Sequence, residues 1–193
     1  MVAVDEGAEM VTTVVFAGGP TGPWVVTRAD AVRGDPLPDA ARVSMTLAAP
    51  GAPGPVAAWA LRGFVSNLRY ATRAEAETLR TIQPALDRAS ATRAALIPIR
   101  KSPAWWELAQ DERRAIFEET SHHTAVGLDY LPAVARRLHH CRDLGEPFDF
   151  LTWFEFAPEH EEDFDRLVAR LRASREWAYV EREVDFRLSR AAA

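Results

Sequence analysis

Two adjacent histidines, His122 and His123, lie in the stretch EETSHHTA at residues 118–125 and are the first candidates for chemistry. An imidazole can bind a metal or exchange a proton near neutral pH. If the stretch is helical, neighbouring side chains point about 100° apart, so the two rings cannot serve one partner. Ile116 and Phe117 set the apolar face, and His123 lies only about 20° from Ile116 around the helix axis. The pattern predicts that His123 faces inward and His122 outward.

The spacing alone leaves the role of an inward His123 open. A core histidine that is hydrogen-bonded to a neighbour is the ordinary alternative. The small residues Thr124, Ala125 and Gly127 leave room for a flat ligand against the helix. A zinc site formed by His123 and the HHC run at 139–141 is another alternative, but adjacent ligands lack the usual His-x₃-His or Cys-x₂-Cys spacing.

Other side chains could share a pocket with this histidine. Lys101 follows an extended run and stands near Trp105 and Trp106. Arg136 lies in the mostly apolar LPAVARR, and Glu176 ends the last predicted helix. Each residue also has an ordinary structural reading, as a surface cation, a core tryptophan or a solvated acid. Together they are compatible with a pocket.

The composition limits the possible partners. The chain has 193 residues with a net charge of −5, and a phosphate-binding surface needs a basic excess, so nucleic acid is not expected as the main partner. A single cysteine, Cys141, excludes an internal disulfide and fits a reducing compartment. The start carries acids where a signal peptide has basic residues, and no stretch approaches the roughly 20 apolar residues of a membrane span. We therefore expect a cytoplasmic protein without a membrane partner.

A strand–helix–strand pattern occurs twice along the chain. In the second copy Phe148, Phe150, Phe154 and Phe156 share one face, and its helix carries an apolar stripe of Phe164, Leu167, Val168 and Leu171. Such units predict an α+β fold, with an antiparallel sheet covered by helices on one side, of the ferredoxin-like kind. The predicted strands are 12–17, 23–27, 43–47, 59–70, 93–101, 148–157 and 178–190, and the predicted helices are 72–86 and 158–177.

A helical block, residues 103–141, is predicted between the copies. Its helices start at Ser102-Pro103, at Gln110-Asp111 and at Pro132, and the third is expected to run through PAVARRLHHC. We divide the chain into a truncated N-terminal unit, 1–102, and a unit of 103–193 that holds the helical block and the C-terminal copy. Both are expected to form one structural domain overall.

The block from Ala95 to Pro158, together with REWAYVEREVDFRLSR, resembles the chlorite dismutase family, and most closely its short, dimeric bacterial lineage. The resemblance extends from about Trp59 to Arg190, and the first 58 residues match only loosely. It implies duplicated ferredoxin-like units that form an antiparallel β-barrel with helices outside, a truncated N-terminal unit and a homodimer. It also implies a haem b cofactor in the C-terminal unit.

The resemblance also implies roles for individual residues. His123 corresponds to the proximal iron ligand, Glu176 to the carboxylate paired with it and Arg136 to the distal catalytic arginine. Lys101, Trp105 and Trp106 correspond to residues around the haem propionates, Tyr70 is a weaker candidate for a propionate contact, and Arg69 is weaker still. The implied reaction converts chlorite to chloride and dioxygen by way of ferryl haem and transient hypochlorite.

Three alternatives to this activity remain. Coproheme decarboxylases share the superfamily, but they lack the distal arginine, use a catalytic tyrosine near a propionate and usually have longer chains. A haem sensor or carrier would need no distal cation, so Arg136 favours the enzyme. The third alternative is an α+β dimer without a cofactor.

Overall fold

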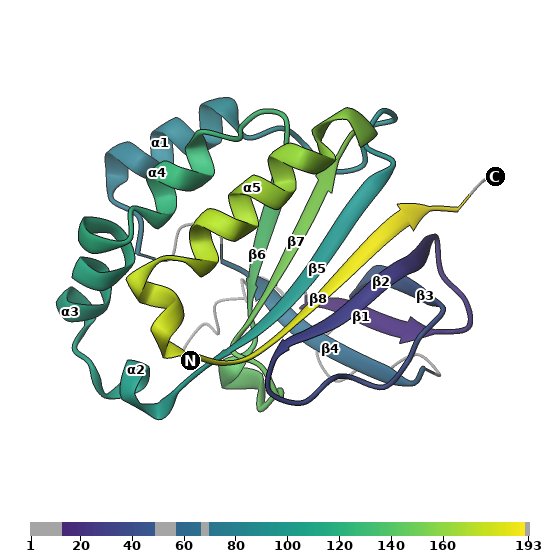
Figure 1. Ribbon diagram of the computed structural model, residues 1–193, viewed down its shortest axis with the longest axis horizontal. Coiled ribbons are helices and arrows are strands. Elements are labelled where there is room, and N and C mark those ends of the chain that lie inside the picture. Colours follow the sequence, from purple (N-terminus) through teal and green to yellow (C-terminus); the bar gives the residue numbers. More distant parts are fainter. Residues whose placement is uncertain (1–12, 49–56, 67–69, 192–193) are drawn as a thin grey trace, which may run out of the picture.

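Eight antiparallel strands form a closed barrel in the part of the chain that the structure, a computed structural model, describes: residues 13–48, 57–66 and 70–191 (Figure 1). The order around the barrel is β1-β3-β2-β8-β5-β7-β6-β4, so β8 joins the N-terminal strand β2 to β5. The strands are β1 Thr13–Gly19, β2 Trp24–Arg33, β3 Arg42–Ala48, β4 Trp59–Val65, β5 Arg93–Lys101, β6 Ala135–His140, β7 Phe150–Phe156 and β8 Val180–Arg190.

The described residues form two apolar cores. One fills the barrel and includes Phe16, Trp59, Leu96, Trp153 and Phe186. The other lies between the outer face of the barrel and the helices. Because successive strand residues point to opposite faces, β5 and β7 supply both cores.

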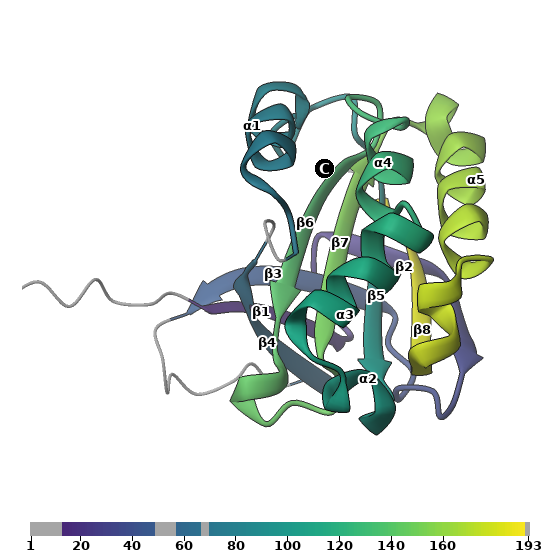
Figure 2. The ribbon, with the colours of Figure 1, turned by 90° about the vertical axis from the view of Figure 1, so that its left-hand side faces the viewer.

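Helices lie over the outer face of β5, β6 and β7 (Figure 2). The predicted stripe of α5 is confirmed, since Phe164, Leu167, Val168 and Leu171 are all buried. The helical segments are α1 Arg73–Ile82, α2 Pro103–Glu107, α3 Gln110–Arg114, the π-helix η1 Ala115–Thr120, α4 His123–Leu128 and α5 Glu161–Arg172, with 3₁₀ turns η2 Arg142–Leu144, η3 Pro158–His160 and η4 Arg175–Tyr179. The expected α+β barrel with helices outside is therefore confirmed.

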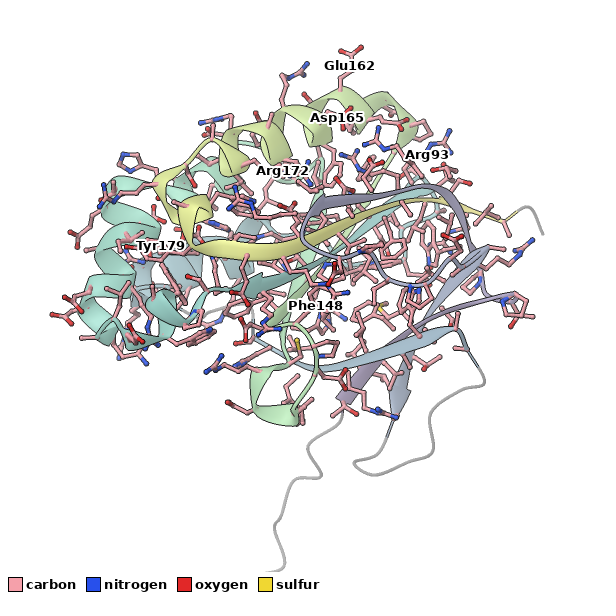
Figure 3. All side chains as sticks on the ribbon, turned by 60° about the horizontal axis from the view of Figure 1, so that its bottom comes forward. Arg93, Phe148, Glu162, Asp165, Arg172 and Tyr179 are labelled. Carbon is pink, nitrogen blue, oxygen red and sulfur yellow. The ribbon has the colours of Figure 1, made fainter. Side chains whose placement is uncertain are left out.

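Ion pairs connect α5 to β8. In Figure 3, Arg172 lies between this helix and the strand, and its Nη2 is 2.5 Å from Glu183 Oε1 and 2.9 Å from Asp185 Oδ2. Arg187 on β8 reaches back to Asp165 on α5 at 2.6 Å. Both acids of β8 are buried, so these arginines compensate charges that would otherwise be costly to bury.

The helix predicted to start at Pro132 is wrong, because Ala135–His140 is the strand β6. This strand pairs with β7 along its whole length, from Ala135↔Glu155 to His140↔Phe150, and with β4 at Phe64 and Val65. Ala, Arg and Leu favour helices locally, but tertiary pairing overrides so weak a preference. The barrel closes through this strand.

Two further predictions need correction. The helix from Asp111 is not continuous, since it passes from α3 into η1 and stops before His122, whose φ is +51°. The four phenylalanines of the second copy do not share one face. Phe150, Phe154 and Phe156 face the helices, whereas Phe148 precedes β7 and packs in the barrel core.

Candidate functional site

An open pocket of about 1060 Å³, including the space where it meets solvent, lies between the sheet and the helices. Its sheet wall comes from β5, β6 and β7, and its helix wall from η1, α4, α5 and the turn η4. The lining is mostly apolar, which is typical of cofactor sites. The polar groups on its walls are Tyr70, Lys101, Trp105, His123, Thr124, Arg136, Thr152, Glu176, Trp177 and Glu183.

His123 reaches the pocket from the first residue of α4. Its Nδ1 lies 2.6 Å from Glu176 Oε2, so the carboxylate engages one ring nitrogen and leaves Nε2 for another partner. Phe117 stacks on the ring with centroids 4.3 Å apart, and Trp177 lies nearly parallel at 6.5 Å. The imidazole is therefore fixed in orientation by one hydrogen bond and two aromatic neighbours.

Glu176 links this imidazole to a buried cation. Its Oε1 accepts a hydrogen bond from Lys101 Nζ at 2.6 Å, and its backbone N–H donates to Ser121 Oγ at 3.0 Å. Burial by itself would raise the pKa of Glu176, but the electrostatic interactions and hydrogen bonds with His123 and Lys101 outweigh it and lower the pKa to about 2. The carboxylate is thus an anion at neutral pH.

The neighbouring ring of His122 is exposed. The expected directions of the two histidines are therefore found, although the continuous helix from which they were derived is absent. The left-handed backbone at His122 ends one helical segment and starts the next with His123. The tandem histidines mark this change of direction.

Arg136 enters the pocket from β6. Its neighbours on the strand alternate, so Arg136 and Leu138 face the pocket while His139 points into the barrel. Among the described residues the guanidinium has no ion pair, and its Nε is buried without a hydrogen-bond partner. Burial lowers the pKa of Arg136. An arginine nevertheless stays protonated in proteins, so the pocket holds an uncompensated cation.

Two further donors on the pocket wall are unpaired. Within residues 13–48, 57–66 and 70–191, the fully buried Trp105 has no hydrogen-bond partner for its indole Nε1, and neither has the buried hydroxyl of Tyr70. The two rings contact each other edge to face, with centroids 6.2 Å apart. Buried donors normally have partners, and these two atoms could donate to the acceptor groups of a ligand in the pocket.

Two residues expected around the haem propionates have partners within the protein. Lys101 lines the pocket and is 4% exposed, and its ammonium lies 2.6 Å from Glu176 Oε1, beside the imidazole of His123. Trp106 is not part of the lining, and its Nε1 donates to Asp149 Oδ2 at 3.3 Å. Arg69 lies outside the described residues. The sequence analysis did not identify Trp177, the residue after Glu176, as a neighbour of the His123 ring.

No cluster of three or more His, Cys, Asp or Glu side chains that could hold a metal ion occurs in the described segments. His139 and Cys141 are in the barrel core, away from His123. The His139 Nδ1 lies 3.1 Å from the Leu151 carbonyl, and burial raises the pKa of the Cys141 thiol. The zinc alternative is therefore wrong for these residues. No helix in the described segments is long and apolar enough to cross a membrane.

Comparison with known proteins agrees with the geometry. A family model described as chlorite dismutase matches residues 58–192. A dimeric chlorite dismutase of Nitrobacter winogradskyi is 57% identical over 92% of this chain and 99% of that chain, with a TM-score of 0.85.

More distant relatives also match. A mutant chlorite dismutase of Candidatus Nitrospira defluvii shares the fold, at 22% identity over 95% of this chain and 93% of that one, with a TM-score of 0.64. The chlorite dismutase of Ideonella dechloratans is 37% identical over 60 residues, which are 31% of this chain and only 20% of that protein. Because the family model covers well over half of its length, the chain belongs to the chlorite dismutase family.

Proposed function

We propose that this protein is a haem b-dependent enzyme that converts chlorite to chloride and dioxygen. The relatives named chlorite dismutase support the reaction. The observation that carries the proposal is a single apolar pocket with two opposite kinds of polar wall. One wall has an imidazole held by a carboxylate, and the other has an arginine that forms no ion pair with the described residues.

The residues present fit a haem. The pocket has the apolar character that a planar macrocycle needs, and a Cβ added at Gly127 would meet nothing within 4 Å. The unpaired donors Trp105 Nε1 and Tyr70 Oη suit the carboxylate oxygens of propionates. His123 offers its free Nε2 as the ligand for iron.

Glu176 and Lys101 would tune that ligand. A carboxylate that accepts the Nδ1–H fixes the ring and makes the imidazole a stronger electron donor. Lys101 balances the buried charge of Glu176 and limits how far it pulls on the proton. This assigns Lys101 to the proximal side, in place of the propionate role expected from the sequence.

Arg136 would bind the anionic substrate. Its guanidinium is planar, permanently charged and free of a protein counter-ion among the described residues, so it can hold the chlorite anion and retain a hypochlorite anion in the pocket. Bound haem would supply the redox chemistry that breaks the Cl–O bond and forms dioxygen. The protein's own residues position the reactants and exclude water.

The proposal is tested by adding chlorite to the haem-loaded protein in an oxygen electrode. We expect one dioxygen and one chloride for each chlorite consumed, at a rate far above that of free haemin. Oxygen release no faster than with free haemin would reject the activity. We also propose a homodimer, because the 57% identical relative is described as dimeric.

A further inference from the structure

The turn before α4 decides where the His123 ring points. The residue before the helix, His122, is in the left-handed region with a φ of +51°, and its side chain forms no cap. The first N–H groups of a helix lack partners within the helix and need acceptors from elsewhere. α4 therefore depends on another residue for its start.

Glu118, in the preceding π-helix, supplies both acceptors. Its Oε2 accepts the Thr124 N–H at 2.6 Å, and its Oε1 accepts the Ala125 N–H at 3.3 Å. Hydrogen bonds from backbone N–H groups to a carboxylate are stronger than neutral ones. One side chain thus holds the two peptide groups that directly follow His123.

The same turn forms two hydrogen bonds with Glu176. Ser121 is buried, and its Oγ accepts the Glu176 N–H at 3.0 Å. His123 Nδ1 meets the Glu176 carboxylate at 2.6 Å. A shift of the turn would therefore change the distance and angle between the imidazole and its carboxylate.

We propose that Glu118 is a positioning residue for the iron ligand. It does not line the pocket, and it acts through the backbone of Thr124 and Ala125 to hold the His123 ring in line with Glu176. The inference rests on the proposed role of His123 as a haem ligand. It explains why a short helix that begins after a left-handed residue can present a ligand in a fixed direction.

The chain offers a matched control in Glu119, which has the same charge, stands at the next position and is exposed. Glu118→Ala and Glu118→Gln are compared with Glu119→Ala and Glu119→Gln in the haem-loaded full chain. The readouts are the iron–imidazole stretching band in resonance Raman spectra and the rate of haemin transfer to excess apomyoglobin. Loss of a negative charge by itself should change both readouts similarly at Glu118 and Glu119. A change in the direction of the His123 ring should change them only in the Glu118 variants.

For Glu118→Ala we expect a shifted stretching band and haemin transfer at least tenfold faster than in the parent. Glu118→Gln should be intermediate, because its amide oxygen can still accept one N–H, and the Glu119 variants should stay within twofold of the parent. Equal bands and equal rates at the two positions would overturn the inference. If Glu118→Ala does not fold, the same comparison between Glu118→Gln and Glu119→Gln decides.

Failure of the proposed function gives a different result. A parent protein that takes up no haemin refutes His123 as a ligand before any variant is compared. In that case amide hydrogen exchange at Thr124 and Ala125 in the haem-free chain still tests whether the Glu118 carboxylate binds these two N–H groups. Faster exchange in Glu118→Gln than in Glu119→Gln supports these hydrogen bonds, and equal exchange overturns them.

Discussion

At the scale of single residues, the pocket separates a satisfied charge from an unsatisfied one. The Glu176 carboxylate is hydrogen-bonded to both His123 and Lys101, so its negative charge is compensated within the protein. Arg136 has no counter-ion among the described residues. A desolvated, unpaired cation is costly, and an anionic substrate removes that cost when it binds.

Replacing Arg136 with alanine should leave haem binding intact and lower oxygen yield. The cation that retains hypochlorite is then absent, so more hypochlorite should leave the pocket and react with a chlorination probe such as monochlorodimedone. We expect activity to fall by one to two orders of magnitude, about the effect of removing one electrostatic contact of a few kcal/mol. Arg137→Ala, at the next strand position, serves as the control. Unchanged oxygen yield and unchanged hypochlorite release would contradict the role of Arg136.

Replacing Glu176 with glutamine should raise the ferric/ferrous reduction potential. A neutral amide draws less on the His123 Nδ1–H, so the imidazole becomes a poorer donor and the ferric state is less favoured. Haem affinity should fall by about 10- to 100-fold, the usual effect of losing such a supporting group. Spectroelectrochemistry measures the first quantity and haemin titration the second. A potential equal to that of the parent would show that the hydrogen bond has no influence on the ligand.

The chemical types of the site residues could be read from the sequence, but their directions only in part. The sequence analysis singled out Lys101, yet its partner Glu176 is 75 residues away, and no local pattern predicts that pairing. Trp105 and Trp106 are adjacent and look equivalent in sequence. Only the packing of α2 turns one indole into the pocket and the other toward Asp149.

At the scale of elements, β6 and η1 decide the shape of the site. Both lie in the segment that the sequence predicts as helical, because Ala, Arg, Leu and Glu favour helices locally. In β6 the hydrogen bonds to β7 override this preference, and the period of two places Arg136 and His139 on opposite faces. In η1 the widened turn lets Glu118 reach α4. The pairing of β6 with β7 and the contact of Glu118 with α4 cannot be predicted from a short stretch of sequence.

The strand β6 also carries a titrating group into the barrel. Burial lowers the pKa of His139 from 6.5 to about 4. The unfolded chain therefore binds a proton more readily than the folded one between these values, and stability is lost as pH falls through this window. We expect His139 to account for up to about 3 kcal/mol of the unfolding free energy lost between pH 6.5 and 4.

Urea unfolding at several pH values measures this effect. His139→Phe removes the titrating group, so its stability should decline less steeply over the window, even if it is less stable at pH 7. The exposed His122→Phe is the control and should keep the slope of the parent. Equal slopes for His139→Phe and the parent would contradict the assignment.

At the scale of the whole molecule, a closed barrel and a layer of helices together form the pocket. Among the described residues, the helices cover β5, β6 and β7, and the strands β1 to β4 follow one another without a helix between them (Figure 1). The repeated strand–helix–strand pattern and its one-sided helix layer could be predicted from alternation. The order of strands could not, because it depends on pairings such as β2 with β8, far apart in sequence.

Sedimentation analysis should show a particle of twice the 21.4 kDa of one chain at micromolar concentration. The expectation rests on the dimeric relative of 57% identity. A haem-loaded and a haem-free sample are run in parallel, since a cofactor can shift an assembly equilibrium. A monomer in both samples would contradict the proposed dimer.

A haemin titration of the parent protein, His123→Ala and His122→Ala, followed in the Soret region, tests whether His123 is the ligand of a bound haem. We expect the parent and His122→Ala each to bind one haem per chain with the spectrum of a histidine-ligated ferric haem. His123→Ala should lose that spectrum or bind at least tenfold more weakly. A parent that stays colourless, or a His123→Ala variant that binds haem with an unchanged spectrum, would contradict this role of His123.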